Sequence, residues 1–518
     1  MDNRRNLKKC MALAVLLVVG SCVYVGAAYG QPWDGNGVEG DPYQIWTAED
    51  MQAIGADANY WDAHFKLMQD IDLGGYTGTE FNIIGIYAEF SYSAAFTGVF
   101  DGSGNKIYNF TYRGSSKRYI GIFGWVAGED AEIRDLVLVD PNVDAGTGDG
   151  VGALVGISGT DFGYGGTLRD CYVEGGRVSG YDYVGGLVGS HRGNIYNCNT
   201  STSVFGDTFV GGLVGYSGYT CYIYSCSSTG DVSGDEEVGG LVGKNRGKIF
   251  NSYSSAEVSG FIEVGGLMGD CHGFGVVISD CYARGRVSGY DTVGGLLGRA
   301  GELIKISNCY ASGRVEGRTE VGGFLGYHGY DSNYSSCFWD NEVNPDLNGI
   351  GDAIDPNVTS KSTAEMQDAN TFIDAGWDFV TPVWKMCNGP DYPKLGWEEC
   401  PELWIEAEIK IVPGTLNLKS KGKWISCYIS LPEGYDVGDI RPSSVFLEGG
   451  IEAESLQTSG QVATARFERS EVEGILEVGE IEVTVNGALA DGTMFSGTDV
   501  IRVIDKGGPQ RHKRLVGR

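Results

Sequence analysis

The sequence has few of the residues that several classes of protein require. Only 13 prolines occur among 518 residues, and the 83 glycines follow no Gly-X-Y period, which excludes a collagen helix. The 38 basic residues are outnumbered by 68 acidic ones, so the chain is a polyanion that repels nucleic acid and anionic membranes. The five histidines never stand four residues apart, which excludes a His-Glu-x-x-His zinc motif.

Long apolar runs are confined to the N-terminus. Elsewhere no stretch is apolar over the roughly 20 residues that a membrane-spanning helix needs. A basic lead at residues 4–9, the apolar run Met11–Val25 and a small-x-small motif at Ala28–Gly30 predict a signal peptide over residues 1–30. Val-Gly-Ser before Cys22 also resembles a lipobox, which would place a lipid there, although the apolar run continues past it. We therefore expect a secreted or cell-surface protein without a transmembrane segment.

One segment recurs throughout the middle of the chain. It reads Val-Gly-Gly-Leu-Val-Gly at Val184–Gly189 and returns about every 28 residues, a period typical of stacked repeat architectures. Related copies begin at Val151, Val210, Val238, Val264, Val293 and Val321.

Each repeat contains three short strand-like pieces. In one unit the first two centre on Ile195 and Val204, and the third is the Gly-Gly-Leu-Val segment itself. Each piece is bounded by Gly, Asn, Ser or Asp, which favours strands and leaves no room for a helix. Because no single coil can bury its own apolar stripe, we predict an all-β fold, a right-handed parallel β-solenoid of roughly eight to ten coils stacked about 4.8 Å apart.

The flanking segments predict short capping helices and a second domain. Thr47 and Asp50 are typical of a helix start, and Thr363 begins a second amphipathic segment with Met366, Phe372 and Ile373 on its apolar side. Alternating runs separated by turn signals then predict a β-sandwich. The predicted organisation is a signal peptide (1–30), an N-terminal cap with the first coils (31–130), the repeat β-solenoid (131–340), its C-terminal cap (341–402), a β-sandwich domain (403–505) and a basic disordered tail (506–518).

The repeat resembles the GLUG motif, which is named for the Gly-Leu-hydrophobic-Gly core that stands here as Gly186–Gly189. The accompanying segments Asn308–Ala311 and Gly313–Val315 match as well, and the resemblance covers roughly residues 131–340. It implies a bacterial β-solenoid at the cell surface or outside the cell. Such repeats also accompany IgA-directed metallopeptidases, whose catalysis resides in a different domain and needs the His-Glu-x-x-His motif that is missing here.

The cysteines form a repeated position. Stacked coils would place equivalent residues about 4.8 Å apart, yet Ser252 occupies the same position in one copy, so we predict packed, mostly free thiols rather than disulfides. Cys387 and Cys400 flank a Gly-Pro-Asp turn and are the best candidates for a disulfide. The six repeated cysteines are Cys171, Cys198, Cys226, Cys281, Cys309 and Cys337.

Two further rows and one loop are candidates for ligand binding. An aromatic row after the cysteines would pack on itself or stack on sugar rings. An acidic row before the Gly-Gly segments would be solvated or bridged by cations, and the acidic loop Asp340–Asp352 could bind calcium through Asp340, Glu342, Asp346 and Asp352. The aromatic row comprises Tyr172, Tyr253, Tyr282, Tyr310 and Phe338, and the acidic row comprises Asp182, Asp207, Asp235, Glu263, Asp291 and Glu320.

The sequence assigns no catalytic, cofactor-binding or metal-binding residues, and calcium is the only cofactor at which it hints. We therefore expect a non-catalytic scaffold for binding or adhesion to an extracellular protein or polysaccharide. The alternative is a polysaccharide lyase or hydrolase on a β-helix, whose site would be a departure from the repeat on adjacent coils. The visible departures, at Cys221, Cys271–His272 and Tyr327–Tyr334, do not assemble an acid–base pair.

Overall fold

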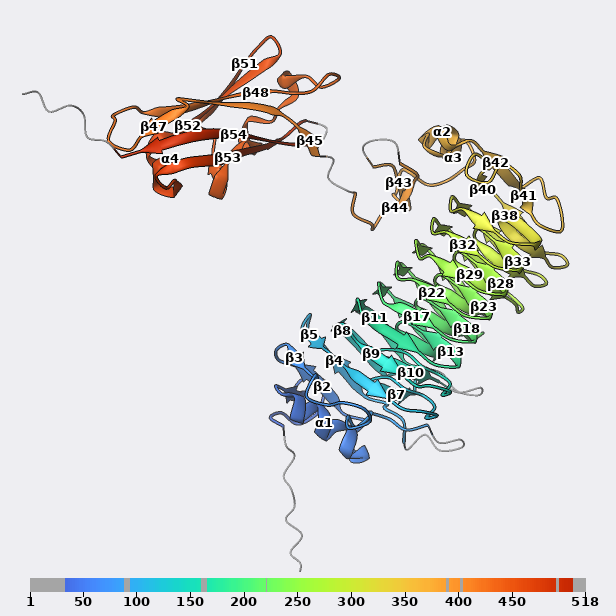
Figure 1. Ribbon diagram of the computed structural model, residues 1–518. Coiled ribbons are helices and arrows are strands. Elements are labelled where there is room, and N and C mark those ends of the chain that lie inside the picture. The colour runs from blue at the N-terminus through green and yellow to red at the C-terminus, as the bar shows by residue number, and fades with distance from the viewer. Residues whose placement is uncertain are drawn as a thin grey trace, which may run out of the picture. The chain divides into compact units, whose positions relative to one another are not determined.

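The computed structural model describes residues 33–87, 94–159, 165–219, 221–387, 391–400, 404–490 and 493–505 (Figure 1). The chain divides into two compact units, Met1–Thr363 and Ala364–Arg518. The predicted signal peptide, Cys22 and the basic tail lie outside the described residues. Within the described ranges, no helix combines the length and the apolar character needed to cross a membrane.

The first unit is a parallel β-solenoid, as the repeat predicted. Its described strands form sheets of 20, 14 and eight strands, and neighbouring strands come from successive coils (Figure 1). Val178 pairs with Val204, and Val204 with Val232, so equivalent residues of the repeat stack in register. The eight-stranded sheet takes one strand from each of eight coils: β6 (Thr111–Arg113), β9 (Asn142–Asp144), β12 (Arg177–Ser179), β17 (Ser203–Phe205), β22 (Val232–Ser233), β27 (Val258–Ser259), β32 (Val287–Ser288) and β37 (Val315–Glu316).

Most coils have more strands than the three pieces that the sequence predicted. The Gly-Gly-Leu-Val segment is not one strand, because the chain bends at Gly212 and Leu213 between two strands of the same sheet. A Cβ on Gly212 would lie 2.2 Å from the Gly240 carbonyl oxygen, so only glycine lets the coils approach this closely. One full coil comprises β15 (Asn194–Tyr196), β16 (Asn199–Thr200), β17, β18 (Thr208–Gly211) and β19 (Val214–Ser217).

The 14-stranded sheet carries the surface described below. Its strands form two sets, one on each side of the bend. The set before the bend is β13 (Asp182–Gly185), β18, β23 (Glu236–Gly239), β28 (Ile262–Gly265) and β33 (Asp291–Gly294). The set after it is β7 (Phe123–Val126), β10 (Val155–Ser158), β14 (Val188–His191), β19, β24 (Val242–Asn245), β29 (Met268–Cys271) and β34 (Leu297–Ala300), while β38 (Thr319–His328) pairs with both β33 and β34. The last strand, β41 (Asn348–Ile350), pairs with β38.

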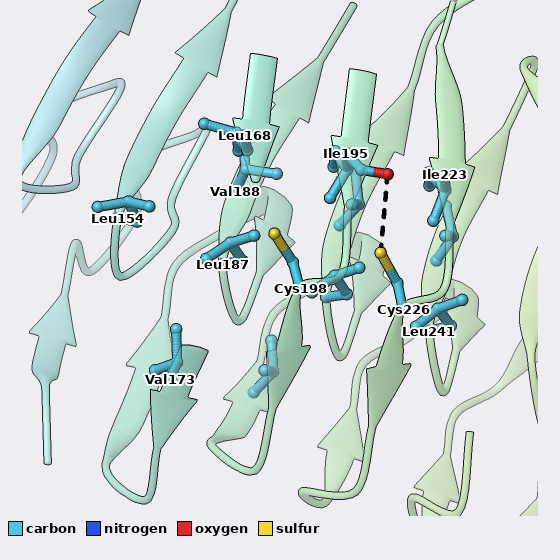
Figure 2. Packing of buried hydrophobic residues seen from close by; sticks show 14 of the residues in the cluster. Leu154, Leu168, Val173, Leu187, Val188, Ile195, Cys198, Ile223, Cys226 and Leu241 are labelled. Atoms are coloured by element: carbon cyan, nitrogen blue, oxygen red, sulfur yellow. Dashed lines mark hydrogen bonds between the residues drawn. The ribbon is translucent and has the colours of Figure 1, made fainter. Parts of the chain in front are cut away.

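The interior of the solenoid is one continuous core that includes the thiol row (Figure 2). All six repeated cysteines are buried and free, as predicted. The Sγ atoms of Cys198 and Cys226 lie 3.2 and 3.3 Å from the carbonyl oxygens two residues earlier. Ser252 donates the same kind of hydrogen bond at 2.7 Å, which explains why a serine fits this position. Burial raises the pKa of Cys337 to about 12, so this interior thiol stays protonated at neutral pH.

The N-terminal cap forms as the sequence predicted. Helix α1 (Ala48–Ala56) begins after Thr47, whose side chain accepts from the Asp50 amide while the Asp50 carboxylate accepts from the Thr47 amide. Met51 and Ile54 are fully buried under the helix. The cap therefore covers the start of the core with its own apolar face.

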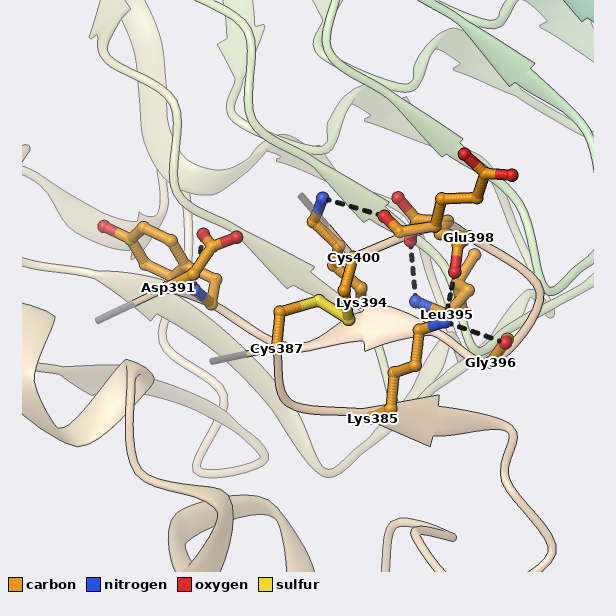
Figure 3. Close-up of a disulfide and its surroundings, with 10 residues drawn as sticks. Lys385, Cys387, Asp391, Lys394, Leu395, Gly396, Glu398 and Cys400 are labelled. Carbon is orange, nitrogen blue, oxygen red and sulfur yellow. Dashed lines mark hydrogen bonds between the residues drawn. A yellow bond between two sulfur atoms is a disulfide. The ribbon is translucent and has the colours of Figure 1, made fainter. Parts of the chain in front are cut away.

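In the second unit, residues up to Cys400 form a small folded segment. Helix α3 (Ala369–Ile373) buries Phe372, but Ile373 is 48% exposed, so the predicted apolar side is narrower than expected. The predicted disulfide between Cys387 and Cys400 is present, with Cα atoms 5.3 Å apart (Figure 3). Cys387 follows β43 (Trp384–Lys385) and Cys400 follows β44 (Lys394–Leu395), and these two strands pair antiparallel.

Residues 404–505 form two sheets around a separate core, which agrees with the predicted β-sandwich. Ile409 and Cys427 face this core from one sheet, and Val483 and Phe495 from the other. The first sheet contains β46 (Glu408–Val412), β48 (Trp424–Ser430), β51 (Ser455–Ser459) and β52 (Val462–Glu468). The second contains β45 (Trp404–Glu406), β47 (Thr415–Asn417), β49 (Phe446–Leu447), β50 (Ile451–Glu452), β53 (Gly479–Ala488) and β54 (Met494–Ile504), and helix α4 (Arg469–Ile475) follows β52.

Candidate functional site

Two columns of side chains meet on the outer face of the 14-stranded sheet. One column stands just before the valine of each motif, where the backbone turns through a left-handed conformation, for example φ 58° at Phe209. The other stands in the middle of each strand after the bend, so that Tyr216 pairs with Lys244 and Lys244 with Asp270. The first column is Tyr183, Phe209, Glu237, Glu263, Thr292 and Glu320, and the second is Ser190, Tyr216, Lys244, Asp270, Arg299 and Tyr327.

The N-terminal half of this face is an aromatic groove of about 360 Å³. Tyr183 and Phe209 stack with ring centroids 4.7 Å apart, and Tyr216 meets both rings edge-on. Tyr87 and Tyr119 continue the lining, with their centroids 4.6 Å apart. The rings fix one another in place, so the groove is built before any ligand arrives.

Three arginines line the same groove. The guanidinium groups of Arg192 and Arg246 lie 5.5 and 5.7 Å from the centre of the Tyr216 ring. Arg118 lies over Tyr119 and forms an ion pair of 3.0 Å with Asp149. Guanidinium groups beside aromatic rings bind anions such as carboxylate or sulfate while the rings contact an apolar surface. We call this surface the aromatic–arginine groove.

The C-terminal half of the face is charged instead. Lys244 Nζ lies 2.9 Å from Glu237 Oε1 and 2.9 Å from Asp270 Oδ2. Arg299 Nη1 lies 2.9 Å from Glu263 Oε1. Lys244 also lies over the Phe209 ring at 5.2 Å, so it joins the two halves of the face. We call Glu237, Glu263 and Asp270, with Lys244 and Arg299, the charged cluster.

Burial governs the electrostatics of this cluster. The Lys244, Glu237 and Asp270 side chains are each 15% exposed or less. Burial, together with the charge of Asp270, raises the pKa of Glu237 to about 7 even though Lys244 opposes the shift. The pKa of Glu263 is raised as well, first by burial and then by the charge of Asp270. Three carboxylates therefore compete for two cations at a site that water reaches poorly.

The predicted acidic row does not exist as a row. Asp182 pairs with Thr208, so Asp207 lies one residue before the position that stacks on Asp182. Ile262 pairs with Asp291, so Glu263 lies one residue after the position that stacks on Asp291. The reason is that the acids lie one, two or three residues before the motif valine in different copies. Of the six, only Glu263 belongs to the charged cluster.

Glu237 and Asp270, the other two carboxylates of the cluster, were missed in the sequence. A signal was available, because Asp270 stands six residues after a motif valine, where adjacent coils carry Lys244 and Arg299. The position thus departs from the repeat on adjacent coils. The departure that the sequence singled out nearby, Cys271, is buried inside the solenoid instead.

The predicted aromatic row packs on itself. Tyr253 and Tyr282 stack with centroids 4.8 Å apart, and Tyr282 and Tyr310 with centroids 4.9 Å apart. Tyr282 is 2% exposed and Tyr310 is fully buried. Of the two readings left open by the sequence, self-packing is the one observed for these rings, and a sugar could not reach the Tyr310 face.

Two carboxylates of the acidic loop accept hydrogen bonds from the protein itself. Asp340 accepts hydrogen bonds from the amides of Glu342 and Val343 and from the Thr363 hydroxyl. Asp352 accepts from the His328 amide. Among the described residues, the only group of three or more His, Cys, Asp or Glu side chains with candidate ligand atoms all within 4.8 Å is Glu237, Glu263 and Asp270. The predicted calcium loop does not bring its acids together in this way.

Comparison with known proteins identifies the repeat. Residues 289–316 match the model of the GLUG motif, which confirms the resemblance seen in the sequence. The chain is 29% identical over 183 residues to "Halomucin" of Haloquadratum walsbyi, covering 35% of this chain and 2% of that protein. It is 34% identical over 191 residues to a "Putative Gly-rich membrane protein" of Evansella cellulosilytica, covering 35% of this chain and 20% of that protein. The alignments thus span a small part of both relatives.

One solved structure is similar over much of the chain. It is the crystal structure of a putative immunoglobulin A1 protease from Bacteroides ovatus, with a TM-score of 0.37 and 21% sequence identity. The match covers 70% of this chain and 95% of the other.

Proposed function

We propose that this GLUG-motif protein is a secreted or cell-surface scaffold that binds an extended acidic polysaccharide in the aromatic–arginine groove. The observation that carries the proposal is the groove itself, in which stacked rings and three guanidinium groups line one hollow. Sugar rings present apolar C–H faces to aromatic side chains, and arginine pairs with carboxylate or sulfate through two parallel hydrogen bonds.

The overall charge of −30 does not oppose this assignment. Salt screens exposed charges beyond about 8–10 Å at physiological ionic strength, so the groups that line the groove dominate there. Arg192 also lines a neighbouring hollow of about 580 Å³ with Tyr219, Tyr222 and Lys248. The basic and aromatic surface therefore continues past the groove, which suits a long ligand better than a small one.

A polysaccharide-cleaving enzyme is the second candidate, and one observation favours it. Glu237, with a pKa raised to about 7, stands beside Asp270, as a general acid stands beside a second carboxylate in glycoside hydrolases. Both carboxylates, however, accept from Lys244, and Asp270 is only 2% exposed. The second carboxylate of such a pair must reach the anomeric carbon or a water, and Asp270 is too buried to reach a sugar, so binding is the better-supported function.

The test is a binding and cleavage panel with the full chain, using acidic polysaccharides such as polygalacturonate and alginate and neutral ones such as cellulose. We expect calorimetric binding of an acidic polymer, no binding of neutral ones, and no new reducing ends or unsaturated products. Binding of neutral polymers alone would refute the role of the arginines. Cleavage would refute the scaffold, and binding of none would refute the proposal.

A matched pair of variants locates the site. Tyr216→Ala should weaken binding at least about tenfold, because it removes one ring and the platform for two guanidinium groups. Tyr290→Ala is the control, since Tyr290 also has an arginine over its ring, Arg318 at 5.5 Å, but lies outside the groove. Equal losses in both variants would place the binding surface elsewhere.

A further inference from the structure

Three carboxylates of the charged cluster converge from neighbouring strands. Glu237 lies on β23, Glu263 on β28 and Asp270 on β29, and one oxygen of each lies within 4.8 Å of the others. All three strands are held on both sides by parallel pairing in the sheet. The convergence is therefore set by rigid backbone rather than by long mobile loops.

Two oxygens of the cluster have no donor. Asp270 is 2% exposed, and while its Oδ2 accepts from Lys244, its Oδ1 is buried and makes no hydrogen bond. Glu237 Oε2 is buried and unpartnered as well. Leaving a buried carboxylate oxygen without a partner is energetically unfavourable, so such atoms normally face a donor or a metal ion.

The charges do not balance either. Three carboxylates stand against the ammonium of Lys244 and the guanidinium of Arg299. When all three carboxylates are ionised, one negative charge remains uncompensated in a largely buried place, where a further positive charge would be stabilised.

We propose that Glu237, Glu263 and Asp270 bind one calcium ion. The donors are all carboxylate oxygens, which favours hard cations over zinc or copper. Oxygens around calcium lie at about 2.3–2.6 Å, so two of them on opposite sides are separated by up to about 5 Å, and the spacing of 4.8 Å or less fits this range. Magnesium needs about 2.0–2.1 Å and a regular octahedron, which is a more demanding arrangement than calcium accepts.

The ion would act on structure rather than on a substrate. It would join two coils through Glu237 and Asp270 and fix the carboxylates that hold Lys244 at the end of the aromatic–arginine groove. The calcium site goes beyond the proposed function and does not depend on it, because calcium binding is measured without any polysaccharide.

The experiment is calorimetric titration of the chelator-stripped full chain with calcium chloride. We expect one ion per chain, binding at least about tenfold tighter than magnesium, and a rise in the unfolding temperature at saturating calcium. The wild-type titration alone is decisive: absence of calcium binding at millimolar concentration would overturn the proposal and indicate that a proton on Glu237 balances the charge.

Variants assign the ligands. Asp270→Asn and Glu263→Gln should each weaken calcium binding at least about tenfold, because each removes a charged ligand. Glu320→Gln is the matched control, as it lies in the same column as Glu263 two coils further on and outside the cluster. If Asp270→Asn fails to fold, Glu263→Gln provides the test. Glu263 forms its ion pair with Arg299, which is more exposed than Lys244, so its replacement should disturb the fold less. Unchanged binding in the folded ligand variants would overturn the assignment.

Discussion

The interior of the coils and the outer face of the 14-stranded sheet are built on the same strands but differ in what they repeat. Inside, Val184, Val210 and Val238 stack in register and are fully buried. Outside, the column that begins with the stacked rings of Tyr183 and Phe209 changes to the carboxylates of Glu237 and Glu263. The backbone is constant, so the chemistry of the face changes without any change of fold. The repeated positions build the scaffold, and the variable positions form the aromatic–arginine groove and the charged cluster.

The largest expected effect comes from changing a repeated interior position. In Gly212→Ala the new Cβ would lie 2.0 Å from the Ser228 hydroxyl oxygen and 2.2 Å from the Gly240 carbonyl oxygen. Because a backbone oxygen of the next coil cannot move alone, we expect the free energy of unfolding to fall by about 3 kcal/mol or more. Denaturant unfolding of the full chain measures the change.

Two controls sharpen that comparison. Gly40→Ala introduces a Cβ with nothing within 4 Å and should leave stability within about 0.5 kcal/mol. Phe209→Ala, on the outer face, should weaken polysaccharide binding while costing less stability than Gly212→Ala, since Phe209 is only partly buried. A greater loss of stability for Phe209→Ala than for Gly212→Ala would break the distinction between interior and face.

A second effect comes from a titratable residue placed inside. His191 on β14 is fully buried in a column where adjacent coils carry Ser158 and Ser217. Burial lowers its pKa to about 3, below the ordinary value near 6.5, so the unfolded chain takes up a proton that the folded chain rejects. Stability from neutral His191 is therefore complete above pH 6.5 and lost as the pH falls toward 3. Between pH 7 and pH 5 the loss should be about 2 kcal/mol.

The measurement compares unfolding free energies at pH 7 and pH 5 in wild type and in His191→Asn. Asparagine occupies the same column at Asn245, so the variant should fold. Its unfolding free energy should fall by about 2 kcal/mol less than that of the wild type between pH 7 and pH 5. His64→Asn, at a partly exposed histidine of β2 (His64–Leu67), is the control and should retain the wild-type slope. An identical pH dependence in His191→Asn would show that other groups cause it.

Much of the scaffold could be predicted from the sequence, because it depends on local patterns. The capping pair Thr47 and Asp50 and the spacing of Cys387 and Cys400 are each readable over a short stretch, and the repeat period is readable by comparing the chain with itself. The charged cluster could not be predicted, because it depends on which residues face each other across a bend. Counting from each motif valine would have aligned Glu237 with Glu263 and Lys244 with Asp270. It would not have shown that these two columns meet on one face.

The smallest effect should come from an interior position that the repeat itself already varies. Cys226→Ser places a hydroxyl where Cys226 Sγ now lies 3.3 Å from the Tyr224 carbonyl oxygen, and Ser252 in the next coil makes the equivalent hydrogen bond. The variant loses the apolar contacts of sulfur but keeps a satisfied polar group, so we expect a loss of about 1 kcal/mol or less. Cys226→Ala, which leaves a cavity and no donor, should cost more. A greater loss of stability in Cys226→Ser than in Cys226→Ala would show that this interior column selects small side chains and not side chains that donate a hydrogen bond. Ser252 would then be explained by its size and not by its hydrogen bond.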